Sequence, residues 1–263
     1  MKKILYLSLT ILLVILLSQS AYAQYKDKDP GKLHFSIAPY FWVLNIDGTN
    51  TVGSVEVPLD VGIGDIFDAL KFAGLGHFEI KQNKWGALID INYLRVGEDN
   101  IKLQPATVLP SPDAFANFRL ALWILEFMGS YRIVGSMDSG LELLLGVRWM
   151  RHNMDLDVTL GPIDLPGGYD EDWLEPVIGA RYYGELGSKW FTSLRGDIGG
   201  FQSSSKFSYT IAGYLGYHIS HVVDIVVGYK LLDILYSNEK EGRDLFKFDG
   251  TLSGFLVGLN FRL

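Results

Sequence analysis

The segment "WLEPVIGARYYGELGSKWFTSLRGDIGGF" (residues 173–201) is mostly apolar and aromatic, yet charges lie inside its two strand-like halves. These charges are Glu175 and Arg181 in the first half, and Arg195 and Asp197 in the second. Successive side chains of a strand point to opposite faces, and within each half the two charges share one parity. The segment therefore predicts a hairpin with one apolar face and one wet face.

The same alternation recurs along the chain from residue 33 onwards. In "GLELLLGVRWMRH" (140–152) the odd positions from Leu141 to Trp149 are apolar, whereas most even positions carry small, polar or charged residues. About ten such segments can be counted, and each is long enough for the roughly 9–11 residues that cross a bilayer as a tilted strand. They cover residues 33–46, 71–82, 85–97, 116–133, 140–156, 173–185, 190–203, 206–219, 222–236 and 246–263.

The connections between these segments alternate in length. Short turns such as "NK" and "LGSK" alternate with long connections, among them 98–115 and 157–172. Short turns on one side and long loops on the other are typical of outer-membrane barrels. Residues 33–263 are therefore predicted to form an all-β, antiparallel transmembrane β-barrel of about ten strands, within a range of eight to twelve. Whether residues 51–60 add a further hairpin stays open at this point.

A soluble β-sandwich also alternates, but three features of the chain argue against it. The segments are long, and their apolar face is continuous and rich in Leu, Ile and Val. Aromatic residues also stand at strand ends on the apolar parity: Trp85 and Trp190 follow short turns, and Tyr131 precedes one. Amphipathic rings prefer the boundary between membrane and water, so these three residues are predicted interface aromatics.

The N-terminus indicates the compartment. Lys2 and Lys3 precede an apolar run and the sequence Ala21-Tyr22-Ala23, which predicts a cleaved signal peptide over residues 1–23. Residues 24–32 are then expected to form a periplasmic lead. The remaining chain holds 21 basic and 30 acidic residues, a net charge of −9, which argues against a nucleic-acid partner. The chain contains no Cys and therefore no disulfide or thiolate metal site.

Several segments resemble a family of uncharacterised outer-membrane β-barrel proteins of Gram-negative bacteria. The resemblance spans nearly all of the chain after the signal peptide, and it implies a barrel in the outer membrane but no reaction and no functional residues. The chain departs from this family at its end, "FRL", where an aromatic residue is usual. The matching segments are "FSIAPYFWVLNIDGT" (35–49), "DIFDALKFA" (65–73), "KWGALIDINYL" (84–94), "LEPVIGARYY" (174–183), "GDIGGF" (196–201) and "GYKLLDI" (228–234).

Charged residues gather on the inward parity of the predicted strands. A ten-stranded barrel is narrow, and an unpaired ion in its lumen would cost several kcal/mol, so mixed signs predict mutual pairing. The expected ladder of lumen charges comprises Glu79, Asp90, Glu126, Glu142, Arg148, Glu175, Arg181, Arg195, Asp197, Asp224 and Lys230.

The turn "QNKW" sets one register. A two-residue loop at Asn83-Lys84 pairs Gln82 with Trp85 and makes His77 and Asp90 direct cross-strand neighbours. A His–Asp pair is a weak catalytic candidate, because a carboxylate can orient an imidazole as a general base. No serine with a flanking nucleophile motif accompanies it. An ion pair or hydrogen bond inside the barrel is the preferred interpretation.

The turn "ELGSKW" sets a second register. Matching the faces requires a loop of odd length, most simply Leu186-Gly187-Ser188 with Gly187 at positive φ. Arg195 then faces Gly179, and Arg181 lies diagonal to Arg195. Both arginines need carboxylates, for which Asp197, Glu142 and Glu126 are the expected sources.

Three functions are compatible with these features. The first is a non-enzymatic outer-membrane protein, either structural or a narrow pore with a charged and largely plugged lumen. The second is an enzyme acting on lipid or envelope substrates, and the third is a binding or adhesion protein acting through its loops. The expected partners are outer-membrane lipid, lipopolysaccharide and the barrel assembly machinery. No cofactor and no metal are expected.

Overall fold

The computed structural model describes residues 31–53, 55–62, 64–65, 70–102, 114–160, 163–201 and 205–263. The expected signal peptide, 1–23, and all of the expected lead except residues 31–32 lie outside these ranges. The strands are β1 (His34–Val52), β2 (Val55–Val61), β3 (Leu70–Gln82), β4 (Trp85–Lys102), β5 (Ala114–Gly135), β6 (Gly140–Leu160), β7 (Ile163–Leu186), β8 (Trp190–Gly199), β9 (Ser205–His218), β10 (Val223–Ser237) and β11 (Phe246–Arg262). A 3-10 turn, Gly242–Asp244, precedes β11.

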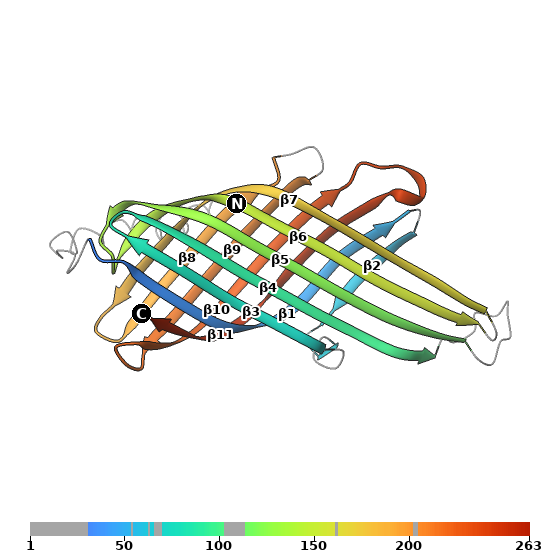
Figure 1. Cartoon of the computed structure of the whole chain (residues 1–263), viewed down its shortest axis with the longest axis horizontal. Coiled ribbons are helices and arrows are strands. Elements are labelled where there is room, and N and C mark those ends of the chain that lie inside the picture. Colours follow the sequence, from blue (N-terminus) through green and yellow to red (C-terminus); the bar gives the residue numbers. More distant parts are fainter. Residues whose placement is uncertain are drawn as a thin grey trace, which may run out of the picture.

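The strands form one antiparallel sheet that closes into a barrel (Figure 1). The order follows the sequence from β11 back to β3 and then β1, and β1 also pairs with β11, so that β1 and β3 to β11 make a closed ring of ten strands. The predicted fold class and strand number are confirmed. The segment left open, 51–60, forms the β1–β2 hairpin, but β2 pairs with β1 alone among the described residues and does not enlarge the ring.

Short turns gather at one end of the barrel, which also carries the end of β11 (Figure 1). The turn at Asn83-Lys84 has Asn83 at φ 54°, a conformation that a two-residue hairpin favours. Because periplasmic turns of such barrels are short, this end is the periplasmic one.

The opposite, extracellular end extends further than expected. The prediction of a long loop over 157–172 is wrong, because β6 continues to Leu160 and β7 starts at Ile163. The polar composition of this stretch resembles a loop, yet its backbone groups pair across the hairpin throughout. Charges on its outward face are matched there too, as Arg151 lies 2.5 Å from Asp170.

The outer wall is apolar around the ring. Exposed Leu, Ile, Val and Phe side chains occupy the outward parity, for example Leu145 at 68% and Ile211 at 60%. At the periplasmic end, Trp85 pairs with Tyr131, with ring centroids 4.7 Å apart, and Trp190 lies 4.8 Å from Tyr217. Among the described residues, no helix is long and apolar enough to cross a membrane. A closed sheet satisfies its backbone internally, which allows strands to cross instead.

The inside of the barrel has two levels. The periplasmic and middle parts hold the charged side chains, and the extracellular part holds a cluster of buried apolar side chains. We call this cluster the apolar layer; it consists of Leu44, Ile46, Val96, Leu122, Ile124, Met150, Trp173, Leu232, Ile234, Tyr236, Phe246, Phe248 and Leu252.

Candidate functional site

Four charged residues stand directly opposite one another on neighbouring strands. Asp90 of β4 pairs with Glu126 of β5, Glu126 with Arg148 of β6, and Arg148 with Glu175 of β7. All four are at most 5% exposed. Like charges at directly opposed positions are destabilising, so the Asp90–Glu126 neighbours require cations from elsewhere in the lumen.

Arg148 is the centre of this site. Its Nε donates to Glu126 at 2.8 Å, and its two terminal nitrogens donate to Glu175 at 2.8 Å and Asp197 at 2.6 Å. Two further bonds run to the hydroxyls of Ser208, at 3.0 Å, and Thr210, at 2.8 Å. A guanidinium has five N–H donors, and here all five are occupied. The side chain is fully buried, so Arg148 holds the lumen together and offers no donor to a ligand.

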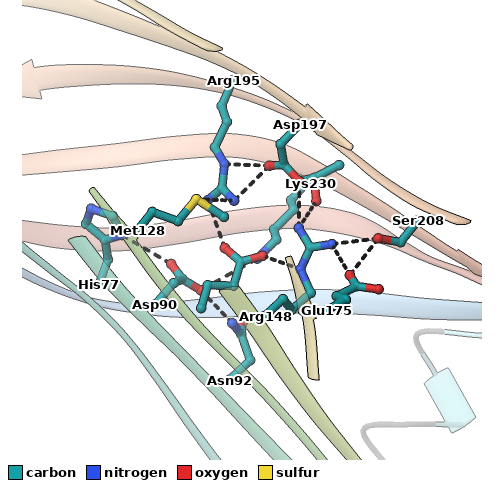
Figure 2. Close-up of polar contacts among 12 residues, drawn as sticks. His77, Asp90, Asn92, Met128, Arg148, Glu175, Arg195, Asp197, Ser208 and Lys230 are labelled. Carbon is teal, nitrogen blue, oxygen red and sulfur yellow. Dashed lines mark hydrogen bonds and ion pairs between the residues drawn. The ribbon is translucent and has the colours of Figure 1, made fainter. Parts of the chain in front are cut away.

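Arg195 of β8 supplies a second cation. Its NH1 lies 2.8 Å from Glu126, and its Nε donates to Asp197 at 2.8 Å. Arg148 and Arg195 thus share the same two carboxylates, Glu126 and Asp197. Figure 2 shows Asp197 between the two guanidinium groups.

Lys230 of β10 supplies the third cation. Its Nζ lies 3.5 Å from Asp90 and 5.0 Å from the centre of the Trp42 ring. Asp90 also accepts hydrogen bonds from Tyr40, at 2.7 Å, and Asn92, at 2.5 Å. Lys230 is only 2% exposed, a burial that this ion pair and the cation–π contact offset.

Arg148, Arg195, Lys230 and the four carboxylates that they contact form one buried set of seven residues, which we call the ionic network (Figure 2). Three cations face four carboxylates, so nearly all of its charge is neutralised internally. Single removal of one member would leave buried charges without partners, whereas the intact set satisfies them. The ionic network consists of Asp90, Glu126, Arg148, Glu175, Arg195, Asp197 and Lys230.

A second charged group lies nearer the periplasm. Arg181 of β7 binds Glu142 through its Nε, at 3.0 Å, and also Glu79. Lys81 of β3 lies 3.2 Å from Glu142 and 3.5 Å from Glu79. The register predicted for the β7–β8 hairpin is wrong by two residues. Arg195 was expected opposite Gly179, but it stands directly opposite Arg181. The two arginines tolerate this position because each has its own pair of carboxylates.

The periplasmic rim holds the last predicted lumen charge, Asp224. It accepts from His218 Nδ1 at 2.7 Å and from Asn260 at 2.8 Å, and lies 2.9 Å from Arg262. His218 lies beyond the Trp190–Tyr217 aromatic pair, outside the membrane-spanning segments. Burial lowers its pKa, but hydrogen bonds to Asp224 and Glu185 outweigh burial, and the pKa of His218 is raised above its ordinary value.

The structure joins the weak catalytic candidates as the turn predicted. His77 and Asp90 are cross-strand partners, with Nδ1 and Oδ2 3.2 Å apart. Asp90 is also held by Tyr40, Asn92 and Lys230, so it belongs to the ionic network. Among the described residues, no group of three or more His, Cys, Asp or Glu side chains is arranged to hold a metal ion.

Sequence reasoning missed several uncharged or distant partners of these ions. Lys81, Tyr40, Ser208 and Thr210 all contact predicted charges. Each lies on the inward parity of its strand, and this parity is the sequence feature that could have identified it as a lumen residue. What the sequence could not indicate is which inward groups meet across the lumen, since Arg148 reaches Thr210 over a separation of 62 residues.

No protein-family model matches the chain, and no curated protein sequence matches it. Solved structures with a similar fold include the translocator domain of the autotransporter NalP from Neisseria meningitidis, at 12% identity, TM-score 0.47, and coverage of 97% of this chain and 96% of that one. The protease OmpT from Escherichia coli has 10% identity, TM-score 0.44, and coverage of 91% and 99%. The attachment invasion protein Ail of Yersinia pestis has 9% identity, TM-score 0.37, and coverage of 89% and 99%. The closed barrel, its apolar wall and its aromatic end make this chain a bacterial outer-membrane β-barrel protein.

Proposed function

We propose that the protein is a non-enzymatic outer-membrane barrel with a closed lumen, structural rather than conducting. The observation that carries this proposal is the state of Arg148, whose five donors are all bound by side chains from β5, β7, β8 and β9. A conducting path for ions would have to pass a guanidinium that ties these strands together across the lumen. Breaking such a buried set exposes uncompensated charge.

Cavities on the periplasmic side agree with this proposal. One of about 330 Å³ is lined by Glu79, Arg181 and Asp224, and one of about 190 Å³ is lined by Asp90 and Arg195. Both lie at or below the ionic network, and the apolar layer follows on its extracellular side. Water entering from the periplasm would therefore reach the network and stop there.

The test is a conductance recording of the purified protein in planar bilayers. We expect no steps above the baseline of the bilayer. Folding is checked separately, by the different gel migration of the barrel before and after boiling, and insertion by co-flotation of the protein with lipid vesicles. Steady ohmic steps from folded, inserted protein would establish a narrow pore and overturn the proposal.

An enzyme acting on lipid is the second candidate, favoured by the contact between His77 and Asp90. Catalysis would require a nucleophile within hydrogen-bond reach of the imidazole. We expect no release of fatty acid from phospholipid vesicles by the native protein. Hydrolysis that disappears in His77→Ala, with the barrel still folded, would support the enzyme instead.

A binding role through the extracellular end is the third candidate, favoured by the length of the β6–β7 hairpin. Beyond Trp149 the hairpin continues to Leu160, roughly 35 Å of paired strand. Its outward face carries exposed, paired charges such as Arg151 and Asp170. Binding of host-cell or matrix protein to whole cells, lost on shortening this hairpin, would support this role.

A further inference from the structure

The wall of the barrel separates between β1 and β3. Their ladder runs from His34–Lys81 and ends at Pro39–Gly76. β3 then stays with β4, whereas β1 stays with β11 and gains β2 as a second neighbour only from Ile46 onwards. Among the described residues, positions 40–45 of β1 have a strand neighbour on the β11 side alone (Figure 1).

The sequence gives a local cause for this separation. Pro39 has no backbone N–H and cannot donate to a ladder, so proline in a sheet is confined to edges and irregular positions. On the opposing strand, Gly74 and Gly76 have no side chains to pack across the gap on the outer face. β3 also has an irregular pairing with β4 between Leu70 and Phe72.

A cavity of about 360 Å³ lies at this separation. It is lined by outward-facing Phe41 and Val257 and by inward-facing residues that belong to the apolar layer, such as Leu44, Ile124 and Leu252. Because both faces contribute, the cavity passes through the wall, from the lipid-facing surface to the apolar layer. Its volume is more than twice the roughly 150 Å³ of an apolar cavity that stays dry and binds benzene.

The cavity lies in the extracellular half of the membrane. Tyr93, which lines it, stacks on Trp123 with ring centroids 4.1 Å apart, and both rings face outward at the end of the membrane-facing wall far from Trp85. Irregular backbone at membrane depth is tolerated only where something shields it from lipid. The strand edges beside the cavity therefore need an occupant or a cover.

One residue of the lining carries a buried polar atom without a hydrogen-bond partner. The indole Nε1–H of Trp42 is buried and has no acceptor among the described residues. The other polar side chain deep in the lining, Asn92, is bonded to Tyr40 and Asp90. A buried donor without an acceptor is costly, so the best occupant is apolar along its length and carries one hydrogen-bond acceptor.

We propose that this cavity binds one acyl chain that enters sideways from the outer leaflet, with a carbonyl or carboxylate oxygen accepting the Trp42 N–H. A fatty acid and the chain of a membrane phospholipid share this chemistry. The surroundings are hydrocarbon, so packing against the lining and the single hydrogen bond determine affinity. The site is independent of whether the lumen conducts.

Photo-crosslinking of the mature, folded protein in phosphatidylcholine vesicles tests the proposal. One arm uses a fatty acid with a diazirine in its chain, and the other a phosphatidylethanolamine with the same group in one chain. Adducts mapped by mass spectrometry are expected on inward-facing Leu44, Ile124 or Leu252, and the arm that produces them identifies the source. Adducts confined to outward-facing side chains in both arms would mean surrounding lipid only and would overturn the proposal.

Matched variants locate the binding. Ala73 lines the cavity, and Ala73→Phe should lower the inward adducts about tenfold by filling it. Ala180→Phe, on the outward face of β7 at the other side of the barrel, should leave them unchanged. Trp42→Phe should lower adducts of the acyl probes and spare those of a diazirine alkane. Unchanged inward adducts in folded Ala73→Phe, or in Leu75→Trp where that variant does not fold, would refute the site.

Discussion

Replacing Arg148 by methionine tests whether the ionic network is one mutually dependent unit. Methionine keeps an unbranched apolar chain and removes the guanidinium. Glu126 and Asp197 would retain Arg195, whereas Glu175 would lose its ion pair with Arg148 and keep the hydrogen bond that Ser208 donates at 2.6 Å. Removing one partner of a buried ion set costs about 3–5 kcal/mol. That is a large fraction of the roughly 5–15 kcal/mol by which folded proteins are stable.

The measurement is the free energy of unfolding by urea in lipid vesicles, followed by tryptophan fluorescence and by gel migration without boiling. Arg151→Met is a matched control three residues further along the same strand. Arg151 forms an exposed pair with Asp170, and such surface pairs contribute little that can be measured. We therefore expect a large loss for Arg148→Met and almost none for Arg151→Met.

A double-mutant cycle with Glu175→Gln separates pairing from packing. Glu175 is an ion-pair partner of Arg148, so the loss of either residue costs less once the other has been replaced, and the double variant should lose about 1–3 kcal/mol less than the two single losses added together. Equal losses in the two arginine variants, or strict additivity in the cycle, would refute the mutual dependence.

Three further outcomes follow from the structure. A methyl group at Gly254 would collide with the Val43 carbonyl whereas one at Gly196 meets open space, so Gly254→Ala should fold poorly and Gly196→Ala normally in the gel-migration assay. The pKa of His218 is raised in the folded barrel, so the protonated imidazole stabilises the fold. This stabilisation is fully present below the unfolded pKa of about 6.5 and is lost as pH rises through the folded pKa. In urea titrations, His218→Gln should therefore lower the free energy of unfolding at pH 5.5 and change it little at pH 9. Truncating Trp173, a large ring of the apolar layer, to Ala should leave the barrel silent in planar bilayers, because the ionic network still closes the lumen; ohmic steps from the folded variant would assign the seal to the apolar layer instead.

Parity and turn length predicted the register of the β3–β4 hairpin beside its turn. The two-residue turn fixed Gln82 opposite Trp85, and His77 met Asp90 as a consequence. The β7–β8 hairpin shows where this reasoning ends. A three-residue loop is present, but it is Gly187-Ser188-Lys189, with Gly187 at φ 86°. This choice pairs Leu186 with Trp190 on the outward face and keeps Lys189 out of the ladder, a preference that a count of loop residues cannot detect.

Inward charges could be identified from parity, and the carboxylates expected beside Arg181 and Arg195 are in place: Glu142 at Arg181, and Glu126 and Asp197 at Arg195. The partners that lie across the lumen could not be identified. The pairing of adjacent strands determines which residues stand side by side, but it does not determine contacts across the lumen. The last two hydrogen bonds of Arg148 go to Ser208 and Thr210, which lie across the lumen. The separation between β1 and β3 could not be predicted from the sequence pattern either. Residues 40–45 and 70–75 keep a largely apolar, strand-like composition, and only Pro39 gives a local sign that a ladder ends there.

The two levels of the lumen have complementary requirements. Charged side chains need a wall that is closed on all sides, because a lipid chain beside Arg148 or Lys230 would replace a hydrogen-bond partner with hydrocarbon. The β1–β3 ladder is continuous up to Pro39, so the wall is intact beside the periplasmic charges and parts only where the apolar layer begins to fill the lumen. Trp42 lies at that boundary, beneath Lys230 on one side and lining the lateral cavity on the other. An acyl chain entering through the wall would therefore meet apolar side chains first, and would place its polar end beside Trp42, where the cavity approaches the ionic network.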